Sequence, residues 1–251
     1  MHAGYGRAVT GLPLTGERTV PDVACENYWF RRHEAVYLAL APRCQGVVVD
    51  AGCGEGYGAD LLASTADRVL ALDYDEPALR HIVGRYPRVA PARANLVALP
   101  VASGSADVVI SLQVIEHLWE QERFVAECAR VLRPGGAFLV STPNRLTFSP
   151  GRDTPLNPFH SREFAPAELA DLLGGNGFDE VEMLGLHHGP RLRELDATHE
   201  GSIADAQVAA AVSGVDMSPA LAADVASVRT DDFTLHGAAL DDCLDLVAVA
   251  R

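Results

Sequence analysis

Short apolar runs alternate with amphipathic stretches between residues 46 and 142, and this alternation predicts strands joined by helices. The predicted strands of this region are Val47 to Val49, Arg68 to Leu72, Val89 to Ala94, Ala106 to Leu112 and Ala137 to Ser141. The predicted helices are Gly58 to Ala66, a helix from Glu76, and Gln121 to Leu132. Strands that are apolar on both faces and connected by helices are typical of a parallel sheet with right-handed crossovers. We therefore predict an α/β fold.

The flanking regions have different patterns. Residues 26–40 have the amphipathic spacing of a helix, and residues 145–165 are rich in proline, glycine and asparagine, which indicates a functional loop. Beyond the helix Pro166 to Leu173, two strand candidates, Val181 to Leu186 and Cys243 to Ala250, are separated by alanine-rich helical patterns at Ile203 to Val212 and Pro219 to Val228. We predict an N-terminal segment covering the site (1–45), a core (46–186 and 241–251) and a helical insert or cap (187–240).

Composition narrows the classes of function. The chain has 251 residues, of which 48% are hydrophobic, enough for one large core without a disulfide or metal staple. Its formal charge of -14 would repel a phosphate backbone, so nucleic acid is excluded as the expected partner. A neutral acceptor such as a carbohydrate or another small molecule remains compatible with this charge.

The spacing of the cysteines and the hydropathy of the chain indicate the cellular compartment in which we expect the protein. The 5 cysteines are scattered and form no C-x-x-C pair, which favours a reducing cytoplasm and predicts no metal site. The side chains of the adjacent residues His187 and His188 would point to opposite faces of a strand, so this pair does not predict a metal site either. No apolar run approaches the ~18 residues of a membrane span.

A glycine-rich turn follows the first predicted strand. In the segment Asp50-Ala51-Gly52-Cys53-Gly54-Glu55-Gly56, the glycines allow a ligand to approach the backbone closely, and the next helix presents unpaired N–H groups. About twenty residues later, Asp73 ends the second strand, where a carboxylate can accept hydrogen bonds from ribose hydroxyls. A nucleoside ligand is predicted. The pattern G-x-G-x-x-A from Gly54 also fits a dinucleotide such as NAD, and that alternative stays open.

Five ordered segments resemble the motifs of class I S-adenosylmethionine-dependent methyltransferases: VVVDAGCGEGYGADLL, LALDYDEPAL, NLVALP, ADVVISLQVIEHL and RVLRPGGAFLVSTPNR. The resemblance implies a Rossmann-like, seven-stranded, mostly parallel sheet with an antiparallel last strand and helices on both faces. It also implies S-adenosylmethionine as cofactor and S-adenosylhomocysteine as product. Asn95 stands where that family often has an aspartate on the adenine amino group. The implied cofactor-binding residues are Asp50, Ala51, Gly52, Cys53, Gly54, Gly56, Asp73, Tyr74, Asn95, Leu96 and Gln113. Tyr28 joins this predicted set because an aromatic ring attracts a sulfonium cation.

The segments outside these motifs are similar to a narrower group. LTGERTVPD, ENYWFRRH, FSPGRDTPLNPFHSREF, HHGPRLRELD and DCLDLVAVAR resemble a methyltransferase encoded with the mycobacterial methylglucose lipopolysaccharide pathway. The likeness implies O-methylation of a sugar hydroxyl, the 6-hydroxyl of glucose units in a cytosolic polysaccharide or its precursor. The alternative is N- or carboxyl-methylation of a small metabolite. A third, non-catalytic interpretation is a nucleoside-binding or partner module.

Four residues are candidates for catalysis. A sugar hydroxyl is a poor nucleophile until it loses its proton, and histidine is the natural general base. His117, in the Glu116-His117-Leu118 segment after the fourth strand, is our first candidate, and His160 is the second. The alternative for Glu116 and His117 is capping of the next helix or pairing with each other. Asn144, at the end of the fifth strand, could orient a hydroxyl or simply turn the chain.

Two further expectations concern the regions outside the core. The ring of Tyr28, in the aromatic cluster of residues 28–30, could face a sulfonium cation, although aromatic residues at helical spacing are also ordinary packing. The alanine-rich helices of the insert could form the interface of a homodimer.

Overall fold

The computed structural model describes Leu12 and residues 18–251. The chain divides into two compact units: residues 36–187 with 235–251, and residues 188–234 with the described part of 1–35. The predicted core of 46–186 and 241–251 lies inside the first unit. Much of the predicted N-terminal segment, residues 1–11 and 13–17, lies outside the described residues.

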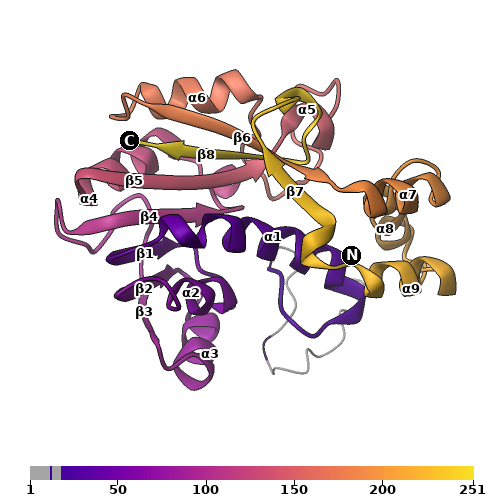
Figure 1. The fold of residues 1–251 in the computed structure, drawn as a ribbon, viewed down its shortest axis with the longest axis horizontal. Helices are drawn as coiled ribbons and strands as arrows, with labels where there is room; N and C mark the ends of the chain where they lie inside the picture. The colour runs from indigo at the N-terminus through magenta and orange to yellow at the C-terminus, as the bar shows by residue number, and fades with distance from the viewer. Residues whose placement is uncertain (1–11, 13–17) are drawn as a thin grey trace. The chain divides into compact units, whose positions relative to one another are not determined.

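An eight-stranded mixed sheet organises the fold, with strand order β3-β2-β1-β4-β5-β8-β6-β7 (Figure 1). Neighbouring strands from β3 to β5 pair in parallel, and β8 pairs antiparallel with both β5 and β6. The strands are β1 (Val47–Ala51), β2 (Arg68–Asp73), β3 (Val89–Arg93), β4 (Ala106–Leu112), β5 (Leu132–Pro143), β6 (Val181–His188), β7 (Phe233–His236) and β8 (Asp245–Ala250). The predicted α/β class and the antiparallel last strand are confirmed.

The helices agree with the predicted pattern over most of the chain. They are α1 (Asn27–Leu40), α2 (Tyr57–Leu62), α3 (Glu76–Arg85), α4 (Gln121–Val131), α5 (Arg145–Phe148), α6 (Pro166–Gly174), α7 (Pro190–Thr198), α8 (Ile203–Ser213) and α9 (Pro219–Ser227). A 3-10 helix, Ile115–His117, follows β4. The predicted insert, residues 187–240, was expected to hold two helices and has three. The additional helix is α7, which begins at Pro190, a position where the missing proline N–H costs no hydrogen bond.

Three details of the sheet differ from the prediction. The expected seven strands are eight, since the four residues of β7 lie in a segment interpreted as purely helical. Strand β5 begins at Leu132 and not at Ala137: the Arg133-Pro134-Gly135-Gly136 sequence stays in the strand, with a register shift opposite Ala106 and Val108. Strand β8 begins at Asp245 because Leu240–Asp242 forms a 3-10 turn before it.

One face of the sheet carries a continuous apolar core. Alternate strand residues, such as Phe138 and Val140 on β5, belong to the same cluster as the buried side chains of α4 and α6. The central strands are buried on both faces, as expected for a sheet covered by helices. This packing leaves the strand ends, where the chain turns, as the positions available for chemistry.

The second compact unit contains α7, α8, α9 and the first half of α1. Asn27 joins two of these helices, since its side-chain amide donates to the carbonyls of Val225 and Val228 at 3.1 and 2.8 Å. Val208, Val212 and Val215 of this unit are exposed. The homodimer through the insert stays a prediction. Among the described residues, no helix is both long and apolar enough to traverse a membrane.

Candidate active site

The carboxyl ends of four neighbouring strands meet at one edge of the sheet. Strand β1 leads into Gly52, β2 ends at Asp73, β4 leads into Gln113 and β5 leads into Asn144. Strands β1 and β4 are direct neighbours in the sheet, with Asp50 on β1 opposite Ile110 on β4. In open α/β sheets, ligands bind outside the carboxyl ends of the strands. The predicted cofactor loop and the predicted catalytic segment therefore share one edge.

The glycine loop has a backbone that side chains disfavour. Gly52, Gly54 and Gly56 have φ angles of 92°, 55° and 99°. The N–H groups of Gly52 and Cys53 both donate to the Leu72 carbonyl, at 2.8 and 3.0 Å, which holds the loop against β2. A Cβ on Gly52 would lie 2.5 Å from Val114 Cγ2, so the loop also packs closely on the segment that leads to His117.

We expect Gly52→Ala to destabilise the fold by about 1 to 3 kcal/mol, because the new methyl group collides with Val114 and the backbone is left-handed. Urea unfolding of the purified variant measures this loss. Gly84→Ala on α3 is the control, since a Cβ there meets nothing within 4 Å. Equal midpoints for the two variants would contradict the close approach.

Asp73 is oriented by the loop that it supports. Its two carboxylate oxygens accept hydrogen bonds from the N–H groups of Gly54, at 2.8 Å, and Asp75, at 2.9 Å. Each oxygen keeps a second lone pair, which suits the two adjacent hydroxyls of a ribose. The position of this carboxylate is therefore determined before any ligand arrives.

Glu55, inside the glycine loop, is a supporting residue that the sequence analysis missed. Its side chain is 1% exposed and accepts hydrogen bonds from the Tyr86 hydroxyl at 2.8 Å and the Tyr57 N–H at 3.1 Å. His81 Nε2 lies 2.6 Å from the same carboxylate. His81 lies on α3 and Tyr86 directly follows it, so the loop is fastened to a helix that sequence spacing does not reveal.

Asp50 is fully buried behind the loop. The Tyr37 hydroxyl donates to both of its carboxylate oxygens at 3.3 Å. Desolvation by burial raises the pKa of Asp50 to about 7, and the nearby charge of Asp73 acts in the same direction. The donor from Tyr37 opposes this shift, and the burial effect is the larger one.

This burial predicts a pH dependence of stability. The unfolded chain releases the Asp50 proton near pH ~4, whereas the folded chain retains it to about pH 7. The contribution of Asp50 to stability is therefore complete below about pH 4 and is lost as the pH rises to about 7. We expect Asp50→Asn to flatten this part of the melting-temperature profile, as measured by scanning calorimetry. The surface variant Asp60→Asn should follow the wild-type profile, and an unchanged Asp50→Asn profile would contradict the assignment.

The other predicted cofactor residues lie near this edge in different environments. Tyr74 is exposed, with the Arg93 guanidinium 4.7 Å from its ring centre. Asn95 Oδ1 accepts a hydrogen bond from the Val97 N–H at 3.2 Å, and Leu96 is buried. Gln113 has a φ of 57°, and its N–H donates to the Ser141 carbonyl. Ala51 and Cys53 are buried at the start of the loop.

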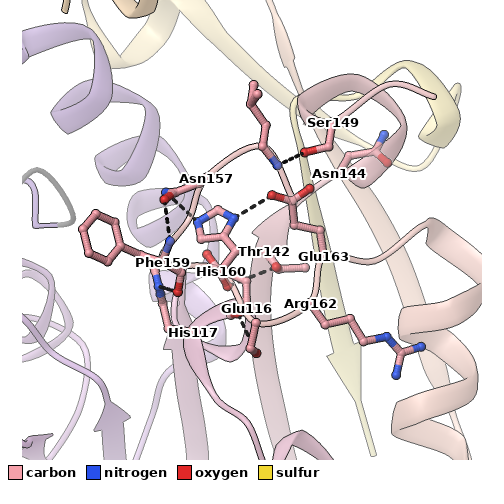
Figure 2. A network of polar contacts seen from close by, with 12 residues as sticks. Glu116, His117, Thr142, Asn144, Ser149, Asn157, Phe159, His160, Arg162 and Glu163 are labelled. Carbon is pink, nitrogen blue, oxygen red and sulfur yellow. Dashed lines mark hydrogen bonds and ion pairs between the residues drawn. The ribbon is translucent and has the colours of Figure 1, made fainter. Parts of the chain in front are cut away.

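The tertiary structure brings Glu116, His117 and His160 together (Figure 2). One donor atom from each side chain lies within 4.8 Å of the others, and the two imidazole rings meet edge to face with centres 4.8 Å apart. The Ser161 N–H donates to the Glu116 backbone carbonyl at 2.6 Å, which joins the two segments. The buried Gln121 amide donates to the carbonyls of Ile115 and Arg162 and strengthens this junction.

The pKa values of Glu116 and His117 are both shifted from their usual values. Burial raises the pKa of Glu116 to about 8, although its carboxylate accepts a hydrogen bond from the Thr142 hydroxyl at 3.0 Å. Desolvation lowers the pKa of His117, and His160 contributes in the same direction. His117 Nδ1 lies 3.1 Å from the Phe159 carbonyl, an acceptor, so Nδ1 carries the hydrogen and Nε2 holds the lone pair of the neutral ring.

The contacts of Asn144 and Tyr28 are those of residues that hold the fold together. Asn144 is buried, donates to the carbonyls of Leu240 and Cys243, and accepts from the Leu146 N–H, which caps α5. These are the contacts of a chain-turning residue. Tyr28 belongs to the other compact unit, where its hydroxyl lies 2.7 Å from His188 Nε2 and its ring packs on Phe233. Its role toward the cofactor stays a prediction.

Comparison with known proteins agrees with this geometry. Residues 49–140 match the model of a methyltransferase domain family. The chain is 62% identical over 245 residues to a probable S-adenosylmethionine-dependent methyltransferase of Mycolicibacterium smegmatis, an alignment that covers 96% of this chain and 95% of the relative. This chain belongs to the class I S-adenosylmethionine-dependent methyltransferases. The predicted family and cofactor are confirmed.

More distant matches extend the comparison. A ubiquinone biosynthesis O-methyltransferase of Cupriavidus pinatubonensis is 31% identical over 159 residues, covering 57% of this chain and 64% of that protein. A solved S-adenosylmethionine-dependent methyltransferase of Mesorhizobium loti superposes with a TM-score of 0.57 at 19% identity, covering 88% of this chain and 98% of that one. The second match concerns the fold alone.

The edge of the sheet fits S-adenosylmethionine. The glycines of the loop have left-handed backbone conformations that side chains disfavour, and Asp73 presents a pre-oriented carboxylate. When bound, the cofactor supplies an electrophilic methyl group on a sulfonium. In this methyltransferase, Gly52 contacts Val114, three residues before His117, so the cofactor loop and the histidine segment are direct neighbours.

Proposed function

We propose that this methyltransferase transfers the methyl group to a sugar hydroxyl, the 6-hydroxyl of glucose units in a polysaccharide or its precursor. Its flanking segments resemble the methyltransferase encoded with the mycobacterial methylglucose lipopolysaccharide pathway, and its M. smegmatis relative is similar over nearly the whole chain. The distant relative named for ubiquinone biosynthesis is an O-methyltransferase, which favours oxygen as the acceptor atom.

The observation that carries this proposal is a pair of exposed aromatic rings beside the histidine cluster. Trp119, two residues after His117, is 90% exposed, and Phe159, whose carbonyl faces His117 Nδ1, is 63% exposed. Large exposed aromatics mark interaction surfaces, and flat rings suit the C–H faces of sugars. An acceptor resting on these rings would lie next to His117 without needing a charged anchor.

The chemistry asks this chain to position the acceptor and activate its oxygen. Methyl transfer from a sulfonium is an in-line displacement, so placing the two reacting atoms ~3 Å apart supplies much of the catalysis. A hydroxyl becomes a useful nucleophile when an electron-pair donor takes its proton or a cation polarises it. We assign this activation to the cluster of Glu116, His117 and His160, with the His117 Nε2 lone pair as the group on which it depends most.

Incubation with methyl-labelled cofactor and a panel of unmethylated and partly methylated glucose oligosaccharides tests the proposal. We expect labelled product whose methyl group maps to a glucose 6-hydroxyl. Amine and carboxylate metabolites belong in the same panel, since transfer to these alone would replace sugar O-methylation with N- or carboxyl-methylation. Cofactor binding without transfer to any panel member or cell-extract component would indicate a binding module.

Trp119→Ala tests the aromatic surface separately. Because the ring contributes acceptor contacts and no reacting atom, we expect KM for the oligosaccharide to rise about tenfold, roughly the loss of 1.4 kcal/mol of contact energy, with little change in kcat. Val83→Ala, exposed on α3, is the matched control. An unchanged KM for Trp119→Ala would remove this surface from the acceptor site.

A further inference from the structure

The cluster of Glu116, His117 and His160 places a buried carboxyl group beside two imidazole rings. Glu116 is 1% exposed, and the side chains of His160 and Glu163 are 4% and 0% exposed. The nearest arginine in sequence, Arg162, stacks on the Phe164 ring and points away from the cluster (Figure 2). Within the part of the chain that the structure describes, neither glutamate pairs with an arginine.

The hydrogen bonds of His160 indicate which of its ring nitrogens carries the lone pair. The Asn157 amide oxygen accepts from the Phe159 N–H at 3.0 Å, so its NH2 group is the part that faces His160 Nε2, at 3.1 Å. A donor facing Nε2 requires a lone pair there, and Nδ1 therefore carries the hydrogen that points at Glu163, 2.7 Å away. In this arrangement, Nε2 of His160 is an electron-pair donor.

Glu163, which lies beside His160, has one carboxylate oxygen without a hydrogen bond among the described residues. Its Oε1 receives the His160 hydrogen bond, whereas its Oε2 is buried and has no hydrogen-bond partner among the described residues. A buried carboxyl group without a cationic partner costs free energy unless it is protonated or coordinates a metal ion. Protein sites in which such groups converge commonly compensate this cost by coordinating a metal ion.

We infer that Glu116, His117 and His160 bind a divalent transition-metal cation through one carboxylate oxygen and two imidazole nitrogens. Both rings are already held in the way metal-binding histidines are held: His160 Nδ1 donates to a carboxylate and His117 Nδ1 to a backbone carbonyl, which leaves Nε2 of each ring as the ligand atom. Two nitrogens and one carboxylate oxygen suit Mn²⁺, Fe²⁺ or Zn²⁺ better than Mg²⁺, which prefers oxygen ligands alone.

The site needs only a local rearrangement to bind the ion. Donor atoms in a four-coordinate zinc shell lie about 3.4 Å apart at bond lengths of about 2.1 Å. In this structure one ligand atom from each of the three side chains lies within 4.8 Å of the others, so binding requires the side chains to move closer together. The Asn157 amide, which occupies the His160 Nε2 lone pair in this structure, would have to turn away. Positions 116, 117 and 160 have no recognisable metal spacing in the sequence, and the expectation of no metal site rests on the cysteines and on His187 and His188.

An open coordination position would receive the acceptor oxygen. Three protein ligands leave at least one position for water or a hydroxyl, and coordination lowers the pKa of a bound O–H group. In that case the His117 lone pair is donated to the cation, and the cation polarises the hydroxyl. This role in turnover rests on the proposed function, whereas binding of the cation does not.

Titration of chelator-treated protein with MnCl2, followed by the electron paramagnetic resonance signal of free Mn²⁺, tests the inference. We expect one tight equivalent that ZnCl2 displaces and MgCl2 displaces poorly. Glu116→Gln and His160→Ala should each weaken this binding at least tenfold, and Glu163→Gln, which disturbs the partner of His160, 10- to 100-fold. His199→Ala, which removes a histidine paired with Asp224 in the other compact unit, is the matched control and should bind normally.

Two results would overturn the inference: no tight equivalent in the wild type, or the same affinity in Glu116→Gln as in His199→Ala. Circular dichroism and cofactor binding establish that each variant is folded, and the isosteric Glu116→Gln carries the test if His160→Ala unfolds. Mn²⁺ binding without sugar methylation would reject the proposed function and keep the metal site. Sugar methylation that survives chelation, with no bound Mn²⁺, would do the reverse.

Discussion

His117→Ala is expected to lower kcat by about 10²- to 10⁴-fold while cofactor affinity stays near the wild-type value. The expected size follows from the usual contribution of a residue that activates the nucleophile, and it applies whether the His117 lone pair binds a proton or a cation. His117 Nδ1 faces the Phe159 carbonyl, whereas the glycine loop is held by the Leu72 carbonyl, so the cofactor site should remain intact.

Steady-state kinetics with an identified acceptor, together with calorimetric binding of S-adenosylhomocysteine, measure the two effects separately. His199→Ala is the matched control, since its ring also pairs with a carboxylate but lies in the other compact unit. Full turnover by folded His117→Ala would favour the alternative reaction, methylation of a nitrogen or carboxylate that needs no activation.

Asp73→Ala is expected to weaken cofactor binding by about 10²- to 10⁴-fold. Two hydrogen bonds from ribose hydroxyls to a charged carboxylate are worth ~1.5 to 3 kcal/mol each, and every 1.4 kcal/mol is a factor of ten in Kd. The substitution also removes the acceptors of the Gly54 and Asp75 N–H groups, so the loop loses part of its support.

Asp73→Asn separates these two contributions, because an amide of the same shape keeps one oxygen acceptor for the loop but loses the charge. We expect its affinity to fall between those of the wild type and Asp73→Ala. Glu76→Ala, which removes an exposed partner of Arg80, is the control. Unchanged Kd in calorimetry for Asp73→Ala would show that the ribose is bound elsewhere.

Much of the fold could be predicted from sequence because its signals are local. The apolar runs of β1, β2 and β4 and the helix spacing of α4 each lie within about a dozen residues, the range over which periodicity reports secondary structure. Strand β7 was missed because its four residues pair only at the end of the sheet order, where tertiary packing decides the conformation. The Arg133-Pro134-Gly135-Gly136 sequence was interpreted as a break because local propensity cannot report that a bulged strand continues through it.

The sequence alone determined the family, and it predicted the glycine loop and Asp73 as the cofactor site, because three closely spaced glycines set the backbone geometry of the loop and the next strand end supplies the carboxylate. Only the tertiary structure decided what surrounds His117. His117 and Phe159 are 42 positions apart in the sequence. The segment that carries Asn157, His160 and Glu163 is joined to Glu116 by the hydrogen bond from the Ser161 N–H to the Glu116 backbone carbonyl. No periodicity encodes such a meeting, because the partners are chosen by how the β4 and β5 connections pack and not by their spacing in the chain.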